Sequence, residues 1–253
     1  MNTTEMNAPA MSALPPVVSR ETWLTARREL LAREKEITRL RDAVNAARRR
    51  LPMVKIETPY VFEGPNGPIG LAGLFEGRRQ LYVHHFMWFE DRNAFCMGCT
   101  KAADTAFDNP SFRETLQERD VTFVAISRAP LSKITEYKAQ HGWTFPWYSS
   151  HGSSFNYDFH TTLDEAKAPI EYNYRNKAEL VAAGIPAEDL KEDWPANSVF
   201  LRDGKDVFHT YSAYTRGLDS LHLPNAFLDL TPFGRQEKWE DSPAGWPRQE
   251  TYV

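Results

Sequence analysis

The chain contains two cysteines, and together they form a CxxC motif, Cys96-Met97-Gly98-Cys99. On the first turn of a helix, residues three apart lie on one face, at about the 5–6 Å Cα separation that a disulfide requires. The spacing therefore predicts reversible dithiol–disulfide chemistry, with Cys96 as the nucleophile and Cys99 as the resolving thiol. The chemistry needs no cofactor, and none is expected.

The reactivity of Cys96 depends on the elements around it. At the end of a central strand and the start of a helix, free backbone N–H groups and the helix dipole favour an anion. Such positions lower the pKa of a cysteine from about 8.5 to roughly 3.5–7.5, and the thiolate is the attacking species. The expected substrate is a disulfide-containing protein or a small-molecule thiol compound.

Metal binding is one alternative for the same two thiols. A CxxC that binds a metal ordinarily needs two further ligands, and the sequence has no second CxxC. His84 and His85 lie on the preceding predicted strand, where alternation turns only one of them toward the motif. A distant histidine would be the other source of a ligand; the candidates are His151, His160 and His209.

Two further alternatives keep the fold but change the function. Peroxiredoxins place Pro and Thr ahead of the reactive cysteine as PxxxTxxC, whereas Phe89 and Asn93 take these places ahead of Cys96. Ahead of Cys99 the same places hold Arg92 and Cys96, so a thiol peroxidase would lack its usual peroxide site. The other alternative is a non-catalytic binding or redox-sensing module.

Strands and helices alternate around the motif. Residues 80–88, 121–127 and 145–149 are rich in β-formers, and the first two runs are nearly continuous in apolar residues, as expected of buried parallel strands. Helical segments are predicted between them, at 99–107, 110–119 and 131–141, and Gly142 ends the last of these. The alternation predicts βαβ units and a largely parallel central sheet.

The remaining segments decorate this core. Residues 1–18 are expected to form a disordered tail and 235–253 a C-terminal tail, on either side of one domain over 19–234. An N-terminal helix is predicted within 19–52. It carries ten basic and five acidic residues over 20–50, a pattern typical of a solvated face, although binding to an acidic partner or to a second copy in a homodimer stays open.

Residues 150–197 interrupt the alternation before a hairpin around Asp203-Gly204. In thioredoxin-like proteins a cis proline just ahead of this hairpin faces the CxxC. Pro195 is the candidate here, and the sequence leaves its isomer open. Near the thiols lie Trp88, Phe89, Phe95 and Met97, which fit either an apolar substrate rim or ordinary core packing.

Composition is that of an ordinary globular protein, with 42% hydrophobic and 25% charged residues and a formal net charge of −4. Neither nucleic acid nor a membrane is indicated as a partner. The first 18 residues lack the features of a signal peptide, so a cytoplasmic location is expected, where a CxxC is more often catalytic or metal-binding than structural.

Several segments resemble an uncharacterised bacterial family of thioredoxin-like, predicted dithiol–disulfide oxidoreductases. The resemblance covers about residues 19–234 and includes residues 120–130 (DVTFVAISRAP), 142–149 (GWTFPWYS), 155–159 (FNYDF) and 207–212 (VFHTYS). It implies a thioredoxin-like three-layer α/β/α sandwich with a mixed central sheet, an added N-terminal helix and an insertion before the C-terminal hairpin. It also implies a redox role for Cys96 and Cys99. Members often have Pro after the first cysteine, where this chain has Met97.

Overall fold

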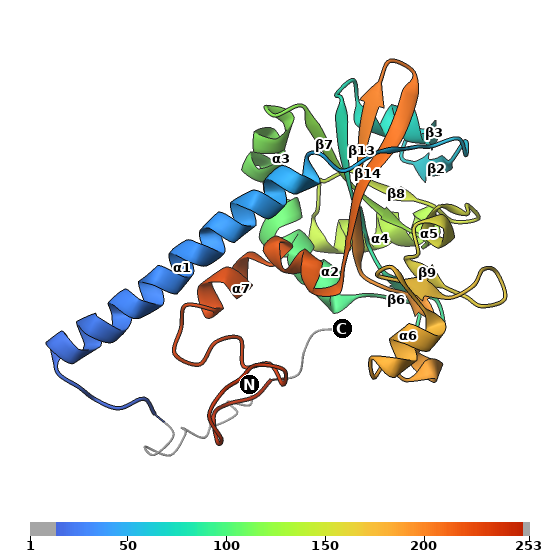
Figure 1. The fold of residues 1–253 in the computed structure, drawn as a ribbon. Coiled ribbons are helices and arrows are strands. Elements are labelled where there is room, and N and C mark those ends of the chain that lie inside the picture. The colour runs from blue at the N-terminus through green and yellow to red at the C-terminus, as the bar shows by residue number, and fades with distance from the viewer. Residues whose placement is uncertain (1–13, 250–253) are drawn as a thin grey trace. The chain divides into compact units, whose positions relative to one another are not determined.

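The computed structural model describes residues 14–249, except for the side chains of Ser220 and Leu221. These residues form two compact units, one of 14–52 with 227–249 and the other of 53–226 (Figure 1). The tails expected at 1–18 and 235–253 lie partly outside the described residues. Within the described residues, no helix has the length and apolar character needed to cross a membrane.

The first unit contains the long helix α1 (Arg20–Arg48), which confirms the helix expected in this segment. The Ser19 side chain accepts a hydrogen bond from the backbone N–H of Thr22 at 3.2 Å and so caps the helix. Glu21 in the first turn and Arg48 in the last turn each suit the helix dipole.

The second unit contains the remaining elements up to residue 226, and α7 spans the boundary between the two units. The strands are β1 (Val54–Lys55), β2 (Val61–Gly64), β3 (Gly67–Gly70), β4 (Gln80–His85), β5 (Trp88–Phe89), β6 (Ala94–Phe95), β7 (Val121–Ser127), β8 (Trp147–Ser149), β9 (Thr162–Leu163), β10 (Glu171–Tyr172), β11 (Arg175–Asn176), β12 (Glu192–Asp193), β13 (Ala196–Asp203) and β14 (Asp206–Tyr214). The helices are α2 (Met97–Ala102), α3 (Pro110–Gln117), α4 (Leu131–His141), α5 (Phe155–Asp158), α6 (Lys177–Ala182) and α7 (Leu223–Leu228). Short 3₁₀-helical segments are η2 (Leu71–Phe75), η4 (Ala187–Asp189) and η5 (Thr215–Leu221), and η3 (Ala103–Phe107) is π-helical.

An eight-stranded mixed sheet in the order β1-β14-β13-β4-β7-β8-β2-β3 forms the centre of this unit. β4 pairs with β7 and β7 with β8 in parallel, whereas β13 runs antiparallel to β4 and β14 antiparallel to β13. The parallel pairs confirm the strand–helix–strand alternation, but the expectation of a largely parallel sheet is wrong, because the other neighbouring strands pair antiparallel. The β13–β14 hairpin (orange in Figure 1) confirms the hairpin expected around Asp203-Gly204.

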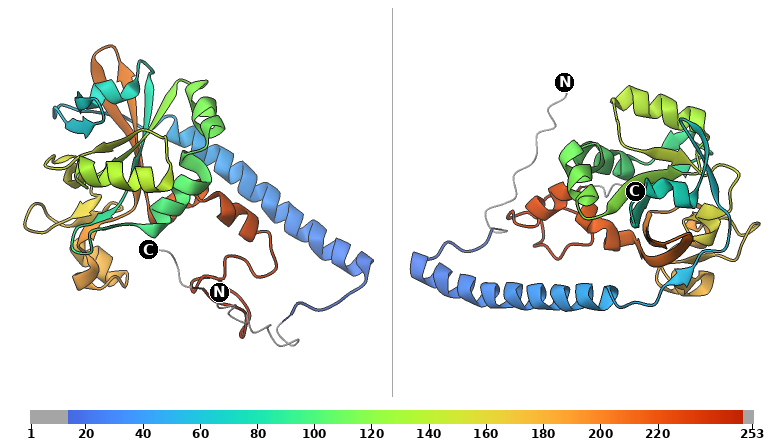
Figure 2. Two further views of the ribbon diagram at one scale, coloured as in Figure 1. Left: turned by 180° about the vertical axis from the view of Figure 1, so that it is seen from behind. Right: turned by 90° about the horizontal axis from the view of Figure 1, so that it is seen from above.

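Each face of the sheet has its own core. Along β7, Phe123 and Ala125 join the core under α2, α3 and α4, while Val124 and Ile126 join the core under η2 and α5. The alternation follows from the two-residue period of a strand. In the view from behind, α4 (yellow-green) lies on the same side as the green α2 and α3 (Figure 2).

The fold is thus the thioredoxin-like α/β sandwich that the sequence predicts. β4, the helices between β4 and β7, and β7 itself form a parallel βαβ unit. α4 then connects β7 to the parallel strand β8. Later in the chain, the antiparallel β13–β14 hairpin adds to the sheet beside β4. α4 ends at Gly142, whose φ of 70° is the left-handed conformation that glycine adopts without steric cost.

Three details differ from the sequence-based expectation or were left open by it. The sequence predicts a polar loop over 90–94, and residues 90–93 are the turn of a small β5–β6 hairpin that it does not predict. The sequence predicts that the first strand of the long hairpin begins at Ser198, whereas it begins at Ala196, so Pro195 directly precedes it. The described residues contain no cis peptide bond, and Pro195 is therefore trans.

Candidate functional site

The CxxC motif follows the short β5–β6 hairpin, beyond the carboxyl end of β4. In the β5–β6 hairpin Trp88 pairs with Phe95, and Cys96 follows as the N-cap residue of α2, with φ −65° and ψ 130°. The N–H of Cys96 donates to the Met87 carbonyl at 3.2 Å, and the Cys96 carbonyl accepts the N–H of Thr100 at 3.0 Å. These bonds fix the first cysteine at the junction between hairpin and helix.

Both thiols are free and almost fully buried, with 2% of Cys96 and 4% of Cys99 exposed. Trp88 and Phe95 are also buried and belong to the core around the thiols, whereas Met97 is 54% exposed. Of the four side chains considered for an apolar rim, Trp88 and Phe95 therefore serve core packing. Access to the Cys96 sulfur is narrow, which favours a small substrate over a bulky one.

The two thiols differ sharply in acidity. A hydrogen bond from the Cys99 thiol is the largest cause that lowers the pKa of Cys96 to about 7; the backbone N–H groups of Cys99 and Gly98 and the charge of Arg92 also lower it, and burial opposes them. The same hydrogen bond, together with burial, raises the pKa of Cys99 well above its usual range. The pair thus holds one proton on Cys99 and an anion on Cys96 near neutral pH.

The carboxyl ends of parallel strands meet at one edge of the sheet, and this edge collects further polar groups. Arg128 directly follows β7, and His151 lies two residues after β8. Asp193 comes to the same edge because Ala196, at the start of the antiparallel β13, pairs with His85 at the end of β4. Open α/β sheets commonly bind ligands at this edge.

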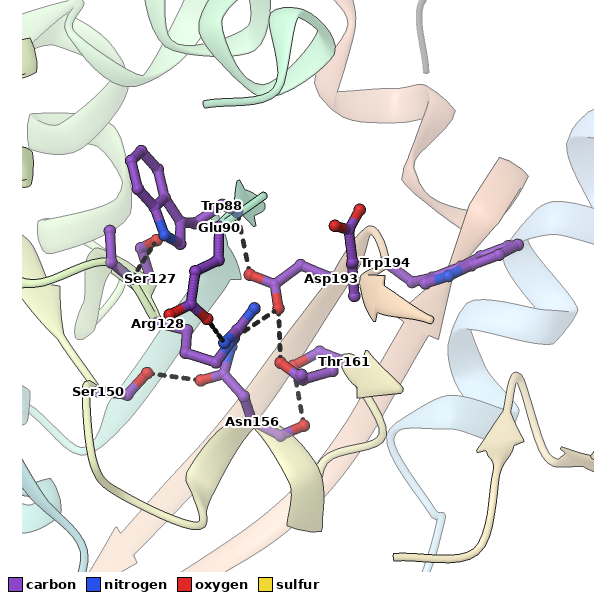
Figure 3. Close-up of polar contacts among 12 residues, drawn as sticks. Trp88, Glu90, Ser127, Arg128, Ser150, Asn156, Thr161, Asp193 and Trp194 are labelled. Atoms are coloured by element: carbon purple, nitrogen blue, oxygen red, sulfur yellow. Dashed lines mark hydrogen bonds and ion pairs between the residues drawn. The ribbon is translucent and has the colours of Figure 1, made fainter. Parts of the chain in front are cut away.

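Asp193 is the centre of a buried polar cluster at this edge (Figure 3). Its carboxylate accepts the backbone N–H of Trp88 at 2.9 Å, the Nε–H of Arg128 at 3.1 Å and the Oγ1–H of Thr162 at 2.6 Å. Burial raises the pKa of Asp193, and the charge of Arg128 and the bond from Thr162 oppose this rise. The cluster joins the hairpin before the cysteines, the end of β7 and the 150–197 insertion.

Arg128 has a second, different partner. Its Nη1 donates to the Glu90 carboxylate at 2.9 Å. The Asp193 side chain is 2% exposed and the Glu90 side chain 71% exposed, while that of Arg128 is 17% exposed. The guanidinium therefore has one edge fixed in the interior and the other edge at the surface.

Two hollows lie beside this arginine, and Glu90 and Arg128 line both. The larger has a volume of about 530 Å³ and an acidic lining that includes Asp91, Asp164, Glu165 and Glu192. The smaller, of about 190 Å³, is lined by Trp88, Glu90, Asn93, Arg128, Pro130, Lys133 and His151. Neither Arg128 nor Asp193 is among the site residues predicted from the sequence. The position of Arg128 directly after a buried strand was the available signal.

The histidines considered as metal ligands are separated by the sheet. His84 Nδ1 lies 2.8 Å from Asn197 Oδ1, and His85 Nε2 lies 2.8 Å from Ser198 Oγ. His84 packs on Phe107 on the side of the cysteine helix, as alternation predicts for one of the two. Among residues 14–249, no three His, Cys, Asp or Glu side chains form a metal-binding group.

The scan of protein families finds one match, which spans almost the whole chain. The family is described as "Bacterial protein of unknown function (DUF899)", and its model matches residues 12–252. No curated protein matches the chain.

Solved structures with a similar fold include a peroxiredoxin and a peroxidoxin. Peroxiredoxin Q from Xanthomonas campestris is 10% identical with a TM-score of 0.44, over 72% of this chain and 98% of that chain. Peroxidoxin BcpB from Mycobacterium tuberculosis is 15% identical with a TM-score of 0.40, over 68% and 93%. A proposed protein disulfide isomerase from Bacteroides thetaiotaomicron is 15% identical with a TM-score of 0.38, over 69% and 87%. These sequence identities and TM-scores are too low to indicate a function for this chain.

Proposed function

Because the chain belongs to the bacterial family of unknown function DUF899, whose description assigns no activity, we propose a function from the site: thiol–disulfide oxidoreduction with Cys96 as nucleophile and Cys99 as resolving thiol. The observation that carries the proposal is the placement of two free thiols, Cys96 as the N-cap residue of α2 and Cys99 buried within its first turn, which makes the two thiols unequal in acidity. Cys96 accepts hydrogen bonds at the start of α2, and Cys99 donates one from the interior. This inequality assigns different roles to the two sulfurs.

The proposed reaction has two displacements. The Cys96 thiolate attacks one sulfur of a substrate disulfide, forms a mixed disulfide and releases the other sulfur as a thiolate, which takes a proton from water. Cys99 then loses its proton and attacks the Cys96 sulfur, and the second substrate thiol leaves. The substrate disulfide is reduced to two thiols while the protein dithiol is oxidised to a Cys96–Cys99 disulfide. A dithiol reductant restores the protein, which is why we propose a reducing compartment such as the cytoplasm.

One observation favours a second candidate, a redox-sensing module. Both thiols are almost fully buried, and a sensor that oxidises once needs less access than an enzyme that turns over. A thiol peroxidase is less favoured, because Asn93 stands where peroxiredoxins have Thr and adopts a left-handed φ of 47°. Turnover distinguishes these candidates.

The test mixes pre-reduced protein with excess 2-hydroxyethyl disulfide and follows the products by intact mass. Wild type should form an internal disulfide and release two mercaptoethanol molecules per chain. Cys99→Ser should stop at a Cys96–mercaptoethanol adduct, and Cys96→Ser should not react at a comparable rate. If Cys96→Ser reacts as fast as wild type, the proposed roles are wrong.

Steady-state reduction in the presence of dithiothreitol then separates enzyme from sensor. Many turnovers above the uncatalysed rate support the oxidoreductase, and one oxidation per chain supports the sensor. Hydrogen peroxide in place of the disulfide serves as the parallel test of peroxidase activity.

A further inference from the structure

The smaller hollow, beside Arg128, is the feature with a charge pattern that points to a ligand. Three of its lining side chains are basic in type, Arg128, Lys133 and His151, and one is acidic, Glu90. Its apolar lining includes the ring of Trp88, a residue of the hairpin that precedes Cys96. The hollow therefore combines basic side chains with residues of the hairpin that leads into the dithiol motif.

Arg128 is held rigidly on its inner side. Its Nε–H donates to Asp193, and Asp193 also accepts the Trp88 N–H. A guanidinium fixed in this way loses little side-chain entropy when it binds a further anion. Trp88 directly follows Met87, whose carbonyl accepts the Cys96 N–H. Through Asp193, Arg128 is therefore linked to the backbone segment that contacts Cys96.

The outer side of Arg128 is only loosely occupied. Nη1 donates to the exposed carboxylate of Glu90, and among residues 14–249 nothing accepts a hydrogen bond from Nη2. Two parallel N–H groups at the end of a guanidinium bind a carboxylate in a bidentate manner. The Glu90 carboxylate thus shows where a ligand carboxylate would bind, and an exposed side chain is easily displaced.

Lys133 adds a second cation without a partner. Its ammonium makes no hydrogen bond or ion pair with any residue from 14 to 249, and it lies in the first turn of α4, behind Pro130. The amino end of this 11-residue helix carries partial positive charge toward the same side. Once Glu90 moves away, no carboxylate lines the smaller hollow, and the acidic side chains of the larger hollow stand on the other side of Arg128.

We propose that this hollow binds the carboxylate of a small-molecule disulfide substrate, with Arg128 and Lys133 as its ligands and Glu90 as an internal competitor. The inference rests on the proposed function and deepens it by naming the substrate class. A volume of about 190 Å³ suits a short carboxylate-bearing chain, and the narrow access to Cys96 excludes bulkier groups.

The test compares three small disulfides that differ in charge: 3,3′-dithiodipropionate (two carboxylates), 2-hydroxyethyl disulfide (neutral) and cystamine (two ammonium groups). The second-order rate constant for oxidation of pre-reduced protein is divided by that of dithiothreitol with the same disulfide, which corrects for leaving-group reactivity. Wild type should prefer the dicarboxylate over the neutral disulfide by about tenfold, the lower range for a hydrogen bond to a charged group.

Two surface variants should move this preference in opposite directions. Lys133→Met should reduce it several-fold, and Glu90→Gln should increase it, because the competing carboxylate is gone. As a control, Lys205→Met removes one positive charge from the β13–β14 turn, at the end of β13 away from Ala196. This variant should leave the preference for the dicarboxylate unchanged. No preference in wild type, no change in Lys133→Met or a decrease in Glu90→Gln would overturn the proposal.

A binding measurement separates this proposal from the function on which it rests. Calorimetric titration of Cys96→Ser with 3,3′-dithiodipropionate and with 2-hydroxyethyl disulfide needs no reaction. Tighter binding of the dicarboxylate, weakened by Lys133→Met, supports the subsite even if wild type reduces no disulfide. Equal or undetectable binding of both probes overturns the subsite, whereas a Cys96-dependent reduction of the neutral disulfide would still support the proposed function.

Discussion

The titration of Cys96 is the most direct consequence of the site geometry. A pKa of about 7 makes about half of Cys96 thiolate at pH 7, whereas a free cysteine with a pKa of about 8.5 is about 3% thiolate. The gain in thiolate is thus about 16-fold. A Brønsted coefficient of about 0.4–0.5 reduces the intrinsic nucleophilicity about fivefold over the same shift, so the net advantage is only about threefold.

Burial makes the rate itself a poor readout. With 2% of Cys96 exposed, slow access of a reagent can cancel a threefold advantage, but it does not move the pH at which the rate is half maximal. The assay is therefore the pH dependence of iodoacetamide labelling of Cys96, followed by peptide mass between pH 5 and 10. The expected midpoint lies near 7.

Variants of Cys99 test the cause of the shift. The hydrogen bond from Cys99 is the largest cause of the lowered pKa of Cys96, so Cys99→Ala should raise the midpoint. Cys99→Ser keeps a donor at the same place and should raise it less. A wild-type midpoint at or above 8.5, or a Cys99→Ala midpoint equal to that of wild type, would refute the reasoning.

Three further predictions concern the framework of the site. Burial lowers the pKa of His84 to about 4 and of His85 to about 3, so the folded state binds fewer protons than the unfolded state below pH 6.5. Stability should therefore decrease as pH falls, by about 4 kcal/mol between pH 7.5 and 5, and equal urea unfolding free energies at the two pH values would contradict this. Asp193→Asn should lower the unfolding free energy by about 3 kcal/mol, because it removes the buried charged partner of Arg128 and leaves only the exposed Glu90; a loss under 1 kcal/mol would mean that Glu90 and solvent compensate. Gly142→Ala should cost about 1–2 kcal/mol through strain at φ 70°, since no atom crowds the added Cβ, and an unchanged melting temperature would show that the helix end adapts.

Much of the fold was predictable because its signals are local. The buried runs at 80–88 and 121–127 and the turn at Asp203-Gly204 each depend on the period and type of neighbouring residues. The helix end at Gly142 follows from the conformational freedom of one residue. These patterns identify an element without knowledge of its partners.

The β5–β6 hairpin and the earlier start of β13 were not predictable in this way. Each of the two small strands has two residues, too few for a period to appear. The start of β13 depends on pairing with β4, where Ala196 faces His85 across 111 positions of sequence, the difference of the two residue numbers. The residue at which a strand begins follows from its pairing with a neighbouring strand and not from propensity alone.

By itself, the sequence determined that two thiols stand three residues apart between a strand and a helix, and therefore what chemistry they are suited to. Only the tertiary structure decided that both thiols are almost fully buried, and that Asp193 and Arg128, 65 positions apart, form an ion pair. The physical reason is that a spacing within one turn is set by backbone geometry, whereas contacts between distant segments are set by sheet register and by the burial of charge that register imposes.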